Sequence, residues 1–359
     1  MYRAAPKRHG PKERHMRITI KDIAERAGVS KTTVSFAFNE PGKISKETYD
    51  RVMGIAGELG YVPDPVARTL TTKRIGAIGL LLPQPIPEAL RNPYLHELMQ
   101  GIGAACHEHD FALTVIPPVK GRIVEAARRA AVDAILTIGV GPGGSIVDLL
   151  QKRHVPFVTI DGKPTDATLN VGIDDRAAAR TLMEFVLGLG HRRIAIIELQ
   201  SETVNEPEER SSLVRDARMA GFRDALDRAG IDLERDVRMH LTECSIEGGR
   251  TAGHELLARD EPRPTVAVCM SDVVAFGFYA ACRERGIRIP EDLSVTGFDD
   301  VPYSSLLSPP LTTVRQPGYL KGYEAARIVL ERLAGGSPGH IVMETELVTR
   351  TSAAAPSGT

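Results

Sequence analysis

The chain has 359 residues, 42% of them hydrophobic, which is enough for two or three domains with a core in each. No apolar run reaches the length of a membrane span and no signal-peptide core begins the sequence, so we expect a cytoplasmic protein without membrane contact. The four cysteines show no Cys-x-x-Cys spacing, which argues against structural disulfides and zinc sites. We expect no metal and no cofactor.

The net charge of −1 is divided unevenly along the chain. Residues 1–74 contain 15 Lys and Arg against 8 Asp and Glu, a net charge of +7. The remaining residues contain 30 against 38, a net charge of −8. A basic segment joined to an acidic one indicates that only the basic segment meets a polyanion. Residues 1–17 have the composition of a disordered basic tail.

Residues 18–39 predict two short helices separated by a glycine turn. Thr19 can cap the first helix, and Asp22 supplies the carboxylate of a capping box. The apolar face of this helix repeats every three or four residues: Ile20, Ile23, Ala24 and Ala27. Gly28 then suits the left-handed conformation that ends a helix.

Ser30 can cap the second helix, in which Val34 and Phe38 point inward. The outward side carries Lys31, Thr32, Thr33, Ser35 and Phe36. This layout is that of a helix-turn-helix, which places its second helix in the major groove of DNA. A small helical hairpin without that role could show the same pattern. We therefore expect residues 18–63 to form a DNA-binding domain.

A third helix and a short helical segment follow. The third helix, Ser45–Leu59, presents one apolar face: Tyr49, Val52, Ile55, Ala56 and Leu59. Gly60–Pro63 ends it, and Asp64 followed by a proline starts another helix. That helix, through Leu70, is too short to be stable alone in water, so it needs a partner surface. We expect residues 64–74 to be a hinge helix and linker.

From Ile75 onward, apolar strands alternate with amphipathic helices. The expected strands are Ile75–Leu82, Ala112–Ile116, Ala134–Ile138, Phe157–Ile160, Ile194–Ile197, Val266–Met270 and Leu293–Gly297. The expected helices are Tyr94–Glu108, Arg122–Ala130, Ile146–Arg153, Arg176–Gly188, Met219–Ala229, Gly248–Ala258 and Val273–Arg285. The fold class is therefore an all-α head followed by an α/β core of two doubly wound parallel-sheet lobes, with a ligand between the lobes.

One pattern favours an enzyme instead. Gly139–Gly144 fits G-x-G-x-x-G between an apolar strand and a helix, and Asp161 stands where a ribose-binding acid would be expected. Against nicotinamide chemistry, Pro142 removes an amide donor and the motif does not lie in the first βα unit. No Ser/His/Asp or Cys/His set is apparent, so we expect no catalytic residue and no enzyme. A solute-binding transport protein is a second alternative, disfavoured by the basic head and the missing export signal.

Several motifs resemble the LacI/GalR family of bacterial transcription regulators over residues 18 to about 350. They are Asp22–Ala24, Ala27–Ser30, Thr33–Ser35, Gly60–Pro63, Ala67–Leu70, Asn92–Tyr94, Leu189–Ile194, Arg218–Phe222, Gly297–Asp300 and Pro310–Val314. The resemblance implies a repressor that binds a near-palindromic double-stranded DNA operator as a homodimer. It also implies a small-molecule effector, a sugar or related metabolite, that controls operator affinity from between the core lobes.

The resemblance also divides the core, residues 75–350, into lobes. The N-lobe comprises about 75–171 and 315–340, and the C-lobe about 172–314 and 341–350. Residues 351–359 are rich in Ala, Ser, Pro and Gly and show no heptad pattern, so we expect a flexible tail and no tetramerisation helix.

For DNA, the resemblance assigns base contacts to Lys31, Thr32 and Phe36. It assigns phosphate contacts or capping to Thr19, Ser30, Thr33, Ser35 and Asn39. Ala67 and Leu70 match the hinge helix, whose paired leucines wedge into the minor groove and kink the duplex. Phe36 departs from the family, which commonly has arginine there. It can offer apolar contact to a thymine methyl, or it can pack against Lys31 and contact no DNA.

For the effector, the resemblance assigns Tyr94, Leu95, Asp161, Arg218, Cys244, Ser271 and Asp299. Asp299 can accept hydrogen bonds from two hydroxyls and Arg218 is a forked donor, which suits polyhydroxylated or anionic ligands. Alternatively, Asp299 only forms a turn and Arg218 lies on a helix surface. Cys244 stands where relatives often have a large aromatic residue. Gln84–Arg91 is longer than the usual family loop, and the chain between Ile116 and Asp133 is shorter.

Overall fold

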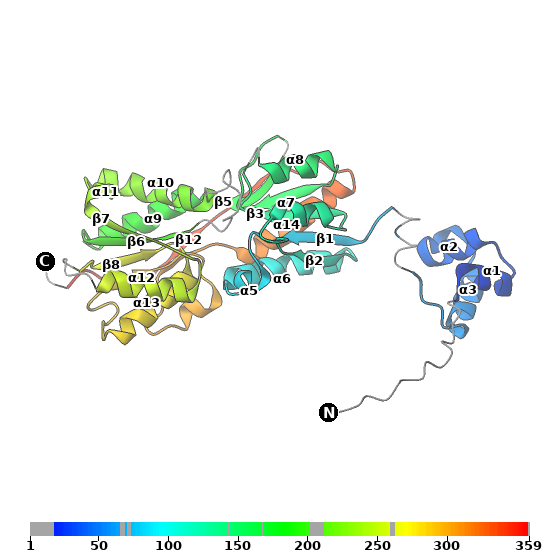
Figure 1. Cartoon of the computed structure of the whole chain (residues 1–359), viewed down its shortest axis with the longest axis horizontal. Coiled ribbons are helices and arrows are strands. Elements are labelled where there is room, and N and C mark those ends of the chain that lie inside the picture. Colours follow the sequence, from blue (N-terminus) through cyan, green and yellow to red (C-terminus); the bar gives the residue numbers. More distant parts are fainter. Residues whose placement is uncertain are drawn as a thin grey trace, which may run out of the picture. The chain divides into compact units, whose positions relative to one another are not determined.

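The computed structural model describes residues 18–64, 69, 73–141, 144–166, 168–200, 212–258 and 263–357. The contacts divide the chain into two units, Met1–Ile75 and Gly76–Thr359. Figure 1 shows the first as a small helical unit and the second as an α/β unit. The expected basic tail lies outside the described residues, as do Ala67 and Leu70 of the expected hinge helix. Within the described ranges, no helix is long and apolar enough to cross a membrane.

The helical unit has the predicted helix-turn-helix layout. Its elements are α1 (Ile20–Ala27), α2 (Lys31–Asn39), the 3-10 helix η1 (Pro41–Lys43) and α3 (Lys46–Glu58). The Thr19 amide donates to the Asp22 carboxylate over 2.8 Å, as the capping box predicts. Gly28 ends α1 with a φ of 65°, a conformation that glycine adopts readily. The Thr33 amide donates to Ser30 Oγ over 3.0 Å, which confirms the second cap.

The three helices share one apolar core. Ile23, Val34 and Val52, one from each helix, are fully buried in it. Phe38 packs against this core and meets the Tyr61 ring with 5.4 Å between ring centroids. The inward positions of α2 are therefore those that the sequence predicts, and the opposite side of the helix faces solvent.

The α/β unit contains two parallel sheets, as expected. The first has the strand order β11-β5-β4-β3-β1-β2 and the second the order β7-β6-β8-β9. The strands of the first are β1 (Ala77–Leu81), β2 (Ala112–Ile116), β3 (Ala134–Ile138), β4 (Phe157–Ile160), β5 (Leu169–Ile173) and β11 (Ile341–Met343). Those of the second are β6 (Ile194–Leu199), β7 (Val237–Thr242), β8 (Val266–Cys269) and β9 (Ser294–Thr296). We call the parts built on these sheets the N-lobe and the C-lobe.

Helices cover both faces of the N-lobe sheet. They are α5 (Ile86–Ala89), α6 (Pro93–Glu108), α7 (Ile123–Arg129), α8 (Ser145–Lys152) and α14 (Gly318–Leu333). α6 and α14 pack with Ile78 and Leu80 of β1, whereas α7 and α8 pack with Ala77 and Leu81. Successive residues of β1 point to opposite faces, so its uninterrupted apolar run is buried on both sides.

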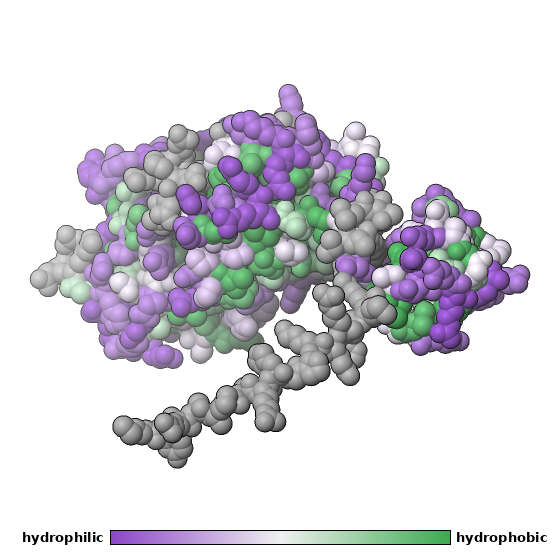
Figure 2. Space-filling model, turned by 45° about the vertical axis from the view of Figure 1, so that its right-hand side comes forward, coloured by the Kyte–Doolittle hydropathy of each residue, from purple (hydrophilic) through white to green (hydrophobic). Residues whose placement is uncertain are grey.

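The C-lobe repeats this arrangement. Its helices are α9 (Asp175–Gly188), α10 (Leu213–Arg228), α11 (Leu233–Asp236), α12 (Ile246–Leu257), α13 (Asp272–Glu284) and the 3-10 helix η3 (Pro302–Ser305). α9 and α10 pack with Ile194 and Ile196 of β6, and α12 and α13 with Ala195 and Ile197. On the face of the molecule in Figure 2, polar and apolar side chains are mixed over both units.

Each strand and helix expected between residues 75 and 297 is present, with small shifts of its bounds. The largest shift is in α10, which begins at Leu213 and not at Met219. Elements that the apolar pattern does not indicate include β5, β7 and α14. The fold class is thus confirmed, although the pattern missed a major helix of the N-lobe.

α6 and α14 approach each other closely at two glycines. A Cβ atom on Gly101 of α6 would overlap the Tyr319 carbonyl, and one on Gly322 of α14 would overlap the Leu98 carbonyl. Since glycine has no Cβ, the two backbones can pack directly. This packing brings Tyr94, in the first turn of α6, within hydrogen-bonding distance of Lys321 in the first turn of α14.

The lobe boundary differs from the expected one near the C-terminal end. Residues 341–350 were assigned to the C-lobe, but β11 pairs with β5 and so completes the N-lobe sheet. The chain then crosses to the C-lobe, where β12 (Glu346–Val348) pairs antiparallel with β10 (Thr313–Arg315) and Leu347 packs against the core. The pairing of β11 with β5 sets this boundary. The family resemblance gives no information about strand pairing.

The expectation of a flexible tail from residue 351 is wrong for the described part, 351–357. Ser352 is fully buried, and its hydroxyl accepts from the Thr312 amide over 2.8 Å and donates to the Val295 carbonyl over 2.6 Å. The Ala354 carbonyl lies 2.9 Å from His191 Nε2. The segment is fixed to the C-lobe by buried hydrogen bonds, which its small polar composition does not reveal.

We predict that Ser352→Ala lowers the free energy of unfolding by about 2 kcal/mol, because it leaves the buried Thr312 amide and Val295 carbonyl each without the hydroxyl partner. Urea unfolding measures this change. Thr351→Ala, at the exposed neighbouring position, is the matched control and is expected to have little effect. Equal stability of the Ser352 and Thr351 variants would show that the segment contributes nothing.

Candidate functional site

The N-terminal end of α2 presents Lys31 and Thr32 to solvent. The Ser30 and Thr33 hydroxyls lie 2.9 Å apart at the cap of the same helix. The Thr19 hydroxyl donates to the Asp22 carboxylate over 2.8 Å. The hydroxyls at these two caps are therefore already engaged in holding the helices, whereas Lys31 and Thr32 extend from a rigid helix into solvent.

Phe36 and Asn39 lie further along α2 and are half-buried. The side-chain amide of Asn39 donates to the Ser35 carbonyl over 3.1 Å, so it closes the last turn of the helix. The ammonium of Lys43 lies 5.1 Å from the centre of the Phe36 ring, a cation–π distance. Phe36 thus packs with Lys43 of η1, whereas the alternative that it contacts no DNA supposed packing against Lys31.

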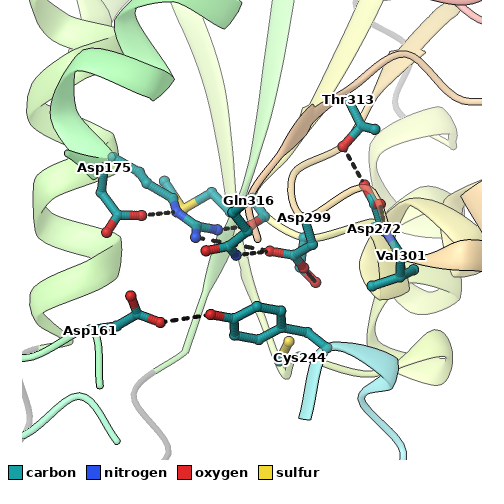
Figure 3. Close-up of polar contacts among 12 residues, drawn as sticks. Asp161, Asp175, Cys244, Asp272, Asp299, Val301, Thr313 and Gln316 are labelled. Atoms are coloured by element: carbon teal, nitrogen blue, oxygen red, sulfur yellow. Dashed lines mark hydrogen bonds and ion pairs between the residues drawn. The ribbon is translucent and has the colours of Figure 1, made fainter. Parts of the chain in front are cut away.

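A second group of polar side chains gathers where the two lobes of the α/β unit meet. We call it the interlobe cluster, and it consists of Tyr94, Asp161, Asp175, Arg218, Ser271, Asp299, Gln316 and Lys321. Figure 3 shows Asp161, Asp175, Asp299 and Gln316 facing one another from different elements. Asp161 directly follows β4 and Asp299 lies three residues after β9, so the carboxyl ends of strands from both sheets supply the cluster.

The N-lobe side of the cluster centres on Asp161. Its backbone has a φ of 53°, which turns the chain sharply after β4. One carboxylate oxygen accepts from the Tyr94 hydroxyl over 2.9 Å, and the other from Lys321 Nζ over 2.6 Å. Lys321 is fully buried and also donates to Tyr94 Oη over 3.0 Å and to Gln316 Oε1 over 2.5 Å. A buried ion pair therefore ties α6, α14 and the end of β4 together.

The C-lobe side centres on Asp299, which is buried. Its carboxylate accepts from Ser271 Oγ over 3.0 Å and from Gln316 Nε2 over 2.5 Å. Gln316 lies between β10 and α14, on the segment that returns to the N-lobe. Since Gln316 bonds both Asp299 and Lys321, one unbroken chain of hydrogen bonds joins the carboxylates at the two strand ends.

Arg218 is buried at the C-lobe edge of the cluster. Its Nε donates to Asp175 over 2.8 Å, and Nη1 donates to the Met270 carbonyl. The guanidinium stacks 3.5 Å from the centre of the Phe298 ring, and Nη2 lies 4.0 Å from Asp299. Arg218 is therefore a positioned, buried cation and not the exposed helix residue of the alternative interpretation.

Burial shifts the pKa of several acids in and around the cluster. It raises the pKa of Asp299 to about 6, opposed by the Arg218 guanidinium and by hydrogen bonds from Gln316 and Ser271. Burial also raises the pKa of Glu97 to about 7, reinforced by the negative charge of Asp299. The pKa of Asp272, fully buried behind Ser271, rises to about 7 for the same two reasons.

Two assigned residues lie differently from the others. Leu95 is buried in the N-lobe core against β1 and its neighbours, so its side chain packs in the fold and does not belong to the polar cluster. Cys244 is half-buried, and its sulfur accepts from the side-chain amide of Asn92 over 3.5 Å. Figure 3 places Cys244 at the lower edge of the cluster. It is a small side chain at the position where the family resemblance predicts an aromatic one.

Sequence analysis missed Lys321, Gln316 and Asp175. A lysine between Leu320 and Gly322 has no sequence feature that separates it from a solvent-exposed lysine. Gln316 is the second residue after the Pro310–Val314 motif, so extending that motif by two residues would have included it. Asp175 stands beside Asp174, which caps α9 through a bond from the Ala177 amide, and only the structure separates the two roles.

The glycine motif lies only partly within the described residues. Gly139 has a φ of 66° and turns the chain after β3, but Pro142 and Gly143 lie outside the described residues. Asp161, the expected ribose partner of that motif, is part of the interlobe cluster through its bonds from Tyr94 and Lys321. Among the described residues, no three His, Cys, Asp or Glu side chains gather where they could hold a metal ion.

We predict that the protein is less stable at pH 8 than at pH 6.5. The folded state holds protons on Asp272 and Glu97 up to a pH of about 7, whereas the unfolded chain releases them near pH 4. The folded state therefore binds more protons in this window, and the free energy of unfolding falls as the pH rises. His191, whose pKa is lowered by burial, opposes this effect at the lower end of the window, and its contribution fades as the pH rises above 6.5. Thermal unfolding between pH 6.5 and 8 measures the trend.

Asp272→Asn isolates the contribution of one group. The amide keeps an oxygen for the Val301 amide and the Ser304 hydroxyl, and the Thr313 hydroxyl can turn to accept. The variant should lose less stability than the parent between pH 6.5 and 8. Asp148→Asn, at an exposed position on α8, is the control and should retain the full loss. An unchanged pH dependence in Asp272→Asn would contradict this assignment.

Comparisons with known proteins agree with the two units. The model of "Bacterial regulatory proteins, lacI family" matches residues 19–64, and that of the "Periplasmic binding protein-like domain" matches residues 183–353. An HTH-type transcriptional regulator of Mycobacterium tuberculosis is 34% identical over 95% of this chain and 98% of its own length. The ribose operon repressor of Haemophilus influenzae is 32% identical over 93% of this chain and 98% of its own.

Among solved structures, a LacI family transcriptional regulator from Enterococcus faecium with bound ribose has a TM-score of 0.66. It is 28% identical and covers 78% of this chain and 99% of its own. Relatives along the whole chain are transcriptional regulators, which overturns both the nicotinamide-enzyme and the transport-protein alternatives. The chain belongs to the LacI family of bacterial regulatory proteins: it is a DNA-binding transcriptional regulator and not an enzyme.

Proposed function

We propose that this regulator is a repressor whose affinity for its operator is controlled by a small polyhydroxylated molecule bound at the interlobe cluster. The observation that carries the proposal is the convergence of Tyr94, Asp161, Arg218 and Asp299 from both lobes onto one buried polar network. Carboxylates and a guanidinium held in fixed positions are suited to bonding several hydroxyl groups at once.

A sugar or a related metabolite fits this chemistry. Each carboxylate oxygen can accept more than one hydrogen bond, so Asp161 and Asp299 retain acceptor capacity beside their internal partners. The comparison structure that binds ribose supports this class of effector. The Ser271 hydroxyl donates a hydrogen bond to Asp299, and this bond would orient the carboxylate toward a ligand.

The DNA-binding half of the proposal rests on the exposed side of α2. Lys31 and Thr32 are proposed to contact base edges in the major groove. The proposed phosphate contacts come from Thr33, Ser35, Asn39 and the capping residues Thr19 and Ser30. Phe36, held against Lys43, offers an apolar edge to a thymine methyl in place of the guanine contact of arginine. A homodimer would place two such helices on a near-palindromic site.

Coupling between effector and DNA requires that the lobes move relative to each other. The polar chain crosses between lobes through Gln316, so a ligand that bonds Asp161 and Asp299 together bears on both lobes at once. A ligand shifts an equilibrium only by its different affinities for the two states. The proposed output is the hinge segment containing Ala67 and Leu70, whose leucines would insert in the minor groove of the operator centre.

We predict that Lys31→Ala weakens operator binding by about 10-fold or more, equivalent to about 1–3 kcal/mol for a base contact. Footprinting first locates the protected palindrome upstream of the gene, and a gel shift then compares the variants at fixed salt concentration. Lys21→Ala on α1, where Lys21 pairs with Glu25, is the matched control. Absence of any protected site near the gene would count against repression of its own locus, and equal affinities of the two variants would remove Lys31 from the base contacts.

Asp299→Asn tests the effector half. It replaces one carboxylate oxygen by an amide, so it should abolish thermal stabilisation by sugars while operator binding without sugar stays unchanged. Differential scanning fluorimetry over a panel of pentoses, hexoses and disaccharides measures the first effect, and the gel shift measures the second. Stabilisation of the variant by the same sugar to the same extent would place the effector elsewhere.

A further inference from the structure

The interlobe cluster contains two cations, and both are committed to internal partners. The Lys321 ammonium has three N–H groups, and three acceptors surround it: Asp161 at 2.6 Å, Gln316 at 2.5 Å and Tyr94 at 3.0 Å. The side chain is fully buried in this cage. Lys321 therefore has no further proton to donate to a ligand.

Arg218 is nearly as constrained. One face of its guanidinium is covered by the Phe298 ring, and Nε and Nη1 are bonded to Asp175 and Met270. The Nη2 group points toward Asp299, 4.0 Å from its carboxylate. An anion that approached Nη2 would lie next to the buried negative charge of Asp299. Arg218 therefore cannot bind a phosphate group without repulsion from that carboxylate.

The acids outnumber these cations. Asp161, Asp175 and Asp299 face Arg218 and Lys321, so the cluster carries a net charge of −1 when all five groups are ionised. Burial raises the pKa values of Asp175 and Asp299, which agrees with an excess of negative charge in a dry environment. The unused capacity of the cluster is for accepting hydrogen bonds, because ionised carboxylates can only accept.

We propose that the interlobe site selects a donor-rich, uncharged or cationic polyhydroxylated molecule and excludes sugar phosphates and sugar acids, with Lys321 as a specificity-determining residue. The proposal rests on the proposed effector site and adds the charge class of its ligand. Lys321 has this role because it neutralises Asp161 from within the protein. All three N–H groups of the Lys321 ammonium, which could otherwise bind a phosphate, are bonded within the cluster.

The test uses matched pairs of probes on the full-length dimer or monomer as purified. D-ribose is compared with ribose 5-phosphate, D-glucose with glucose 6-phosphate and with glucosamine, and further pentoses and hexoses with their phosphate esters, at constant ionic strength. Fluorimetric thermal shift screens the panel and calorimetric titration measures affinities. We expect each phosphate ester to bind at least about 10-fold more weakly than its parent sugar, since it buries an anion in a cluster that already carries an excess negative charge.

The outcomes separate this inference from the proposed function. A phosphate ester that binds more tightly than its parent overturns the charge selection but leaves an effector site between the lobes. If no sugar and no ester in the panel binds, the polyhydroxylated effector itself is contradicted. Weaker binding of esters, or tighter binding of glucosamine than of glucose, supports the selection.

A variant pair ties the selection to the cluster. Asp161→Asn keeps the shape of the side chain and removes one negative charge, so the preference for parent sugar over phosphate ester should fall several-fold. Asp148→Asn removes the same charge from an exposed position on α8 of the same lobe and should leave the preference unchanged. The ratio of affinities is the readout, because a general loss of folding would not alter it selectively. Equal ratios in both variants would mean that the cluster does not set the selection.

Discussion

The buried ion pair between Lys321 and Asp161 is the interaction on which the interlobe cluster depends. Two charges removed from water cost several kcal/mol each unless hydrogen bonds surround them, and here Tyr94 and Gln316 complete the set. That geometry is possible only because α6 and α14 pack backbone to backbone at Gly101 and Gly322. Glycine has low helix propensity, yet two glycines stand in this helix interface. Their close packing positions the Lys321 ammonium beside Tyr94.

The two units handle polar groups in opposite ways. In the helical unit, hydroxyls and carboxylates such as Ser30 and Asp22 close the ends of short helices, and an apolar core below them keeps α2 rigid. Lys31 can then face solvent without any structural task. In the α/β unit, the polar groups are buried and bonded to one another across the lobes. A rigid exposed helix suits contact with a fixed partner, whereas a connected buried network couples groups from both lobes.

The sequence predicts those parts of the fold that depend on local pattern. Strands such as β8 are uninterrupted apolar runs because both faces of a parallel sheet are covered, and the caps of the head follow from single residues. The sequence does not predict β5, because Asn170 and Gly172 interrupt its apolar run. It does not predict α14, because Lys321, at a buried position, breaks the amphipathic pattern. The family resemblance identified Asp161, Arg218 and Asp299, which the structure brings together, but composition gave no sign of the burial of Ser352.

The interlobe cluster also explains why a ligand between these lobes would act on the whole core. Its members come from strand ends in both sheets and from the segments around Asp175 and Gln316, where the chain passes between the lobes. A ligand that competes with Gln316 for Asp299 must lengthen or replace the bond from Gln316 Nε2, and the Oε1 atom of the same amide accepts from Lys321 of the N-lobe. The transmission follows from connected hydrogen bonds with few alternative partners. Under the proposed function, an effector that bonds Asp299 would exchange bonds within this network, which joins both lobes.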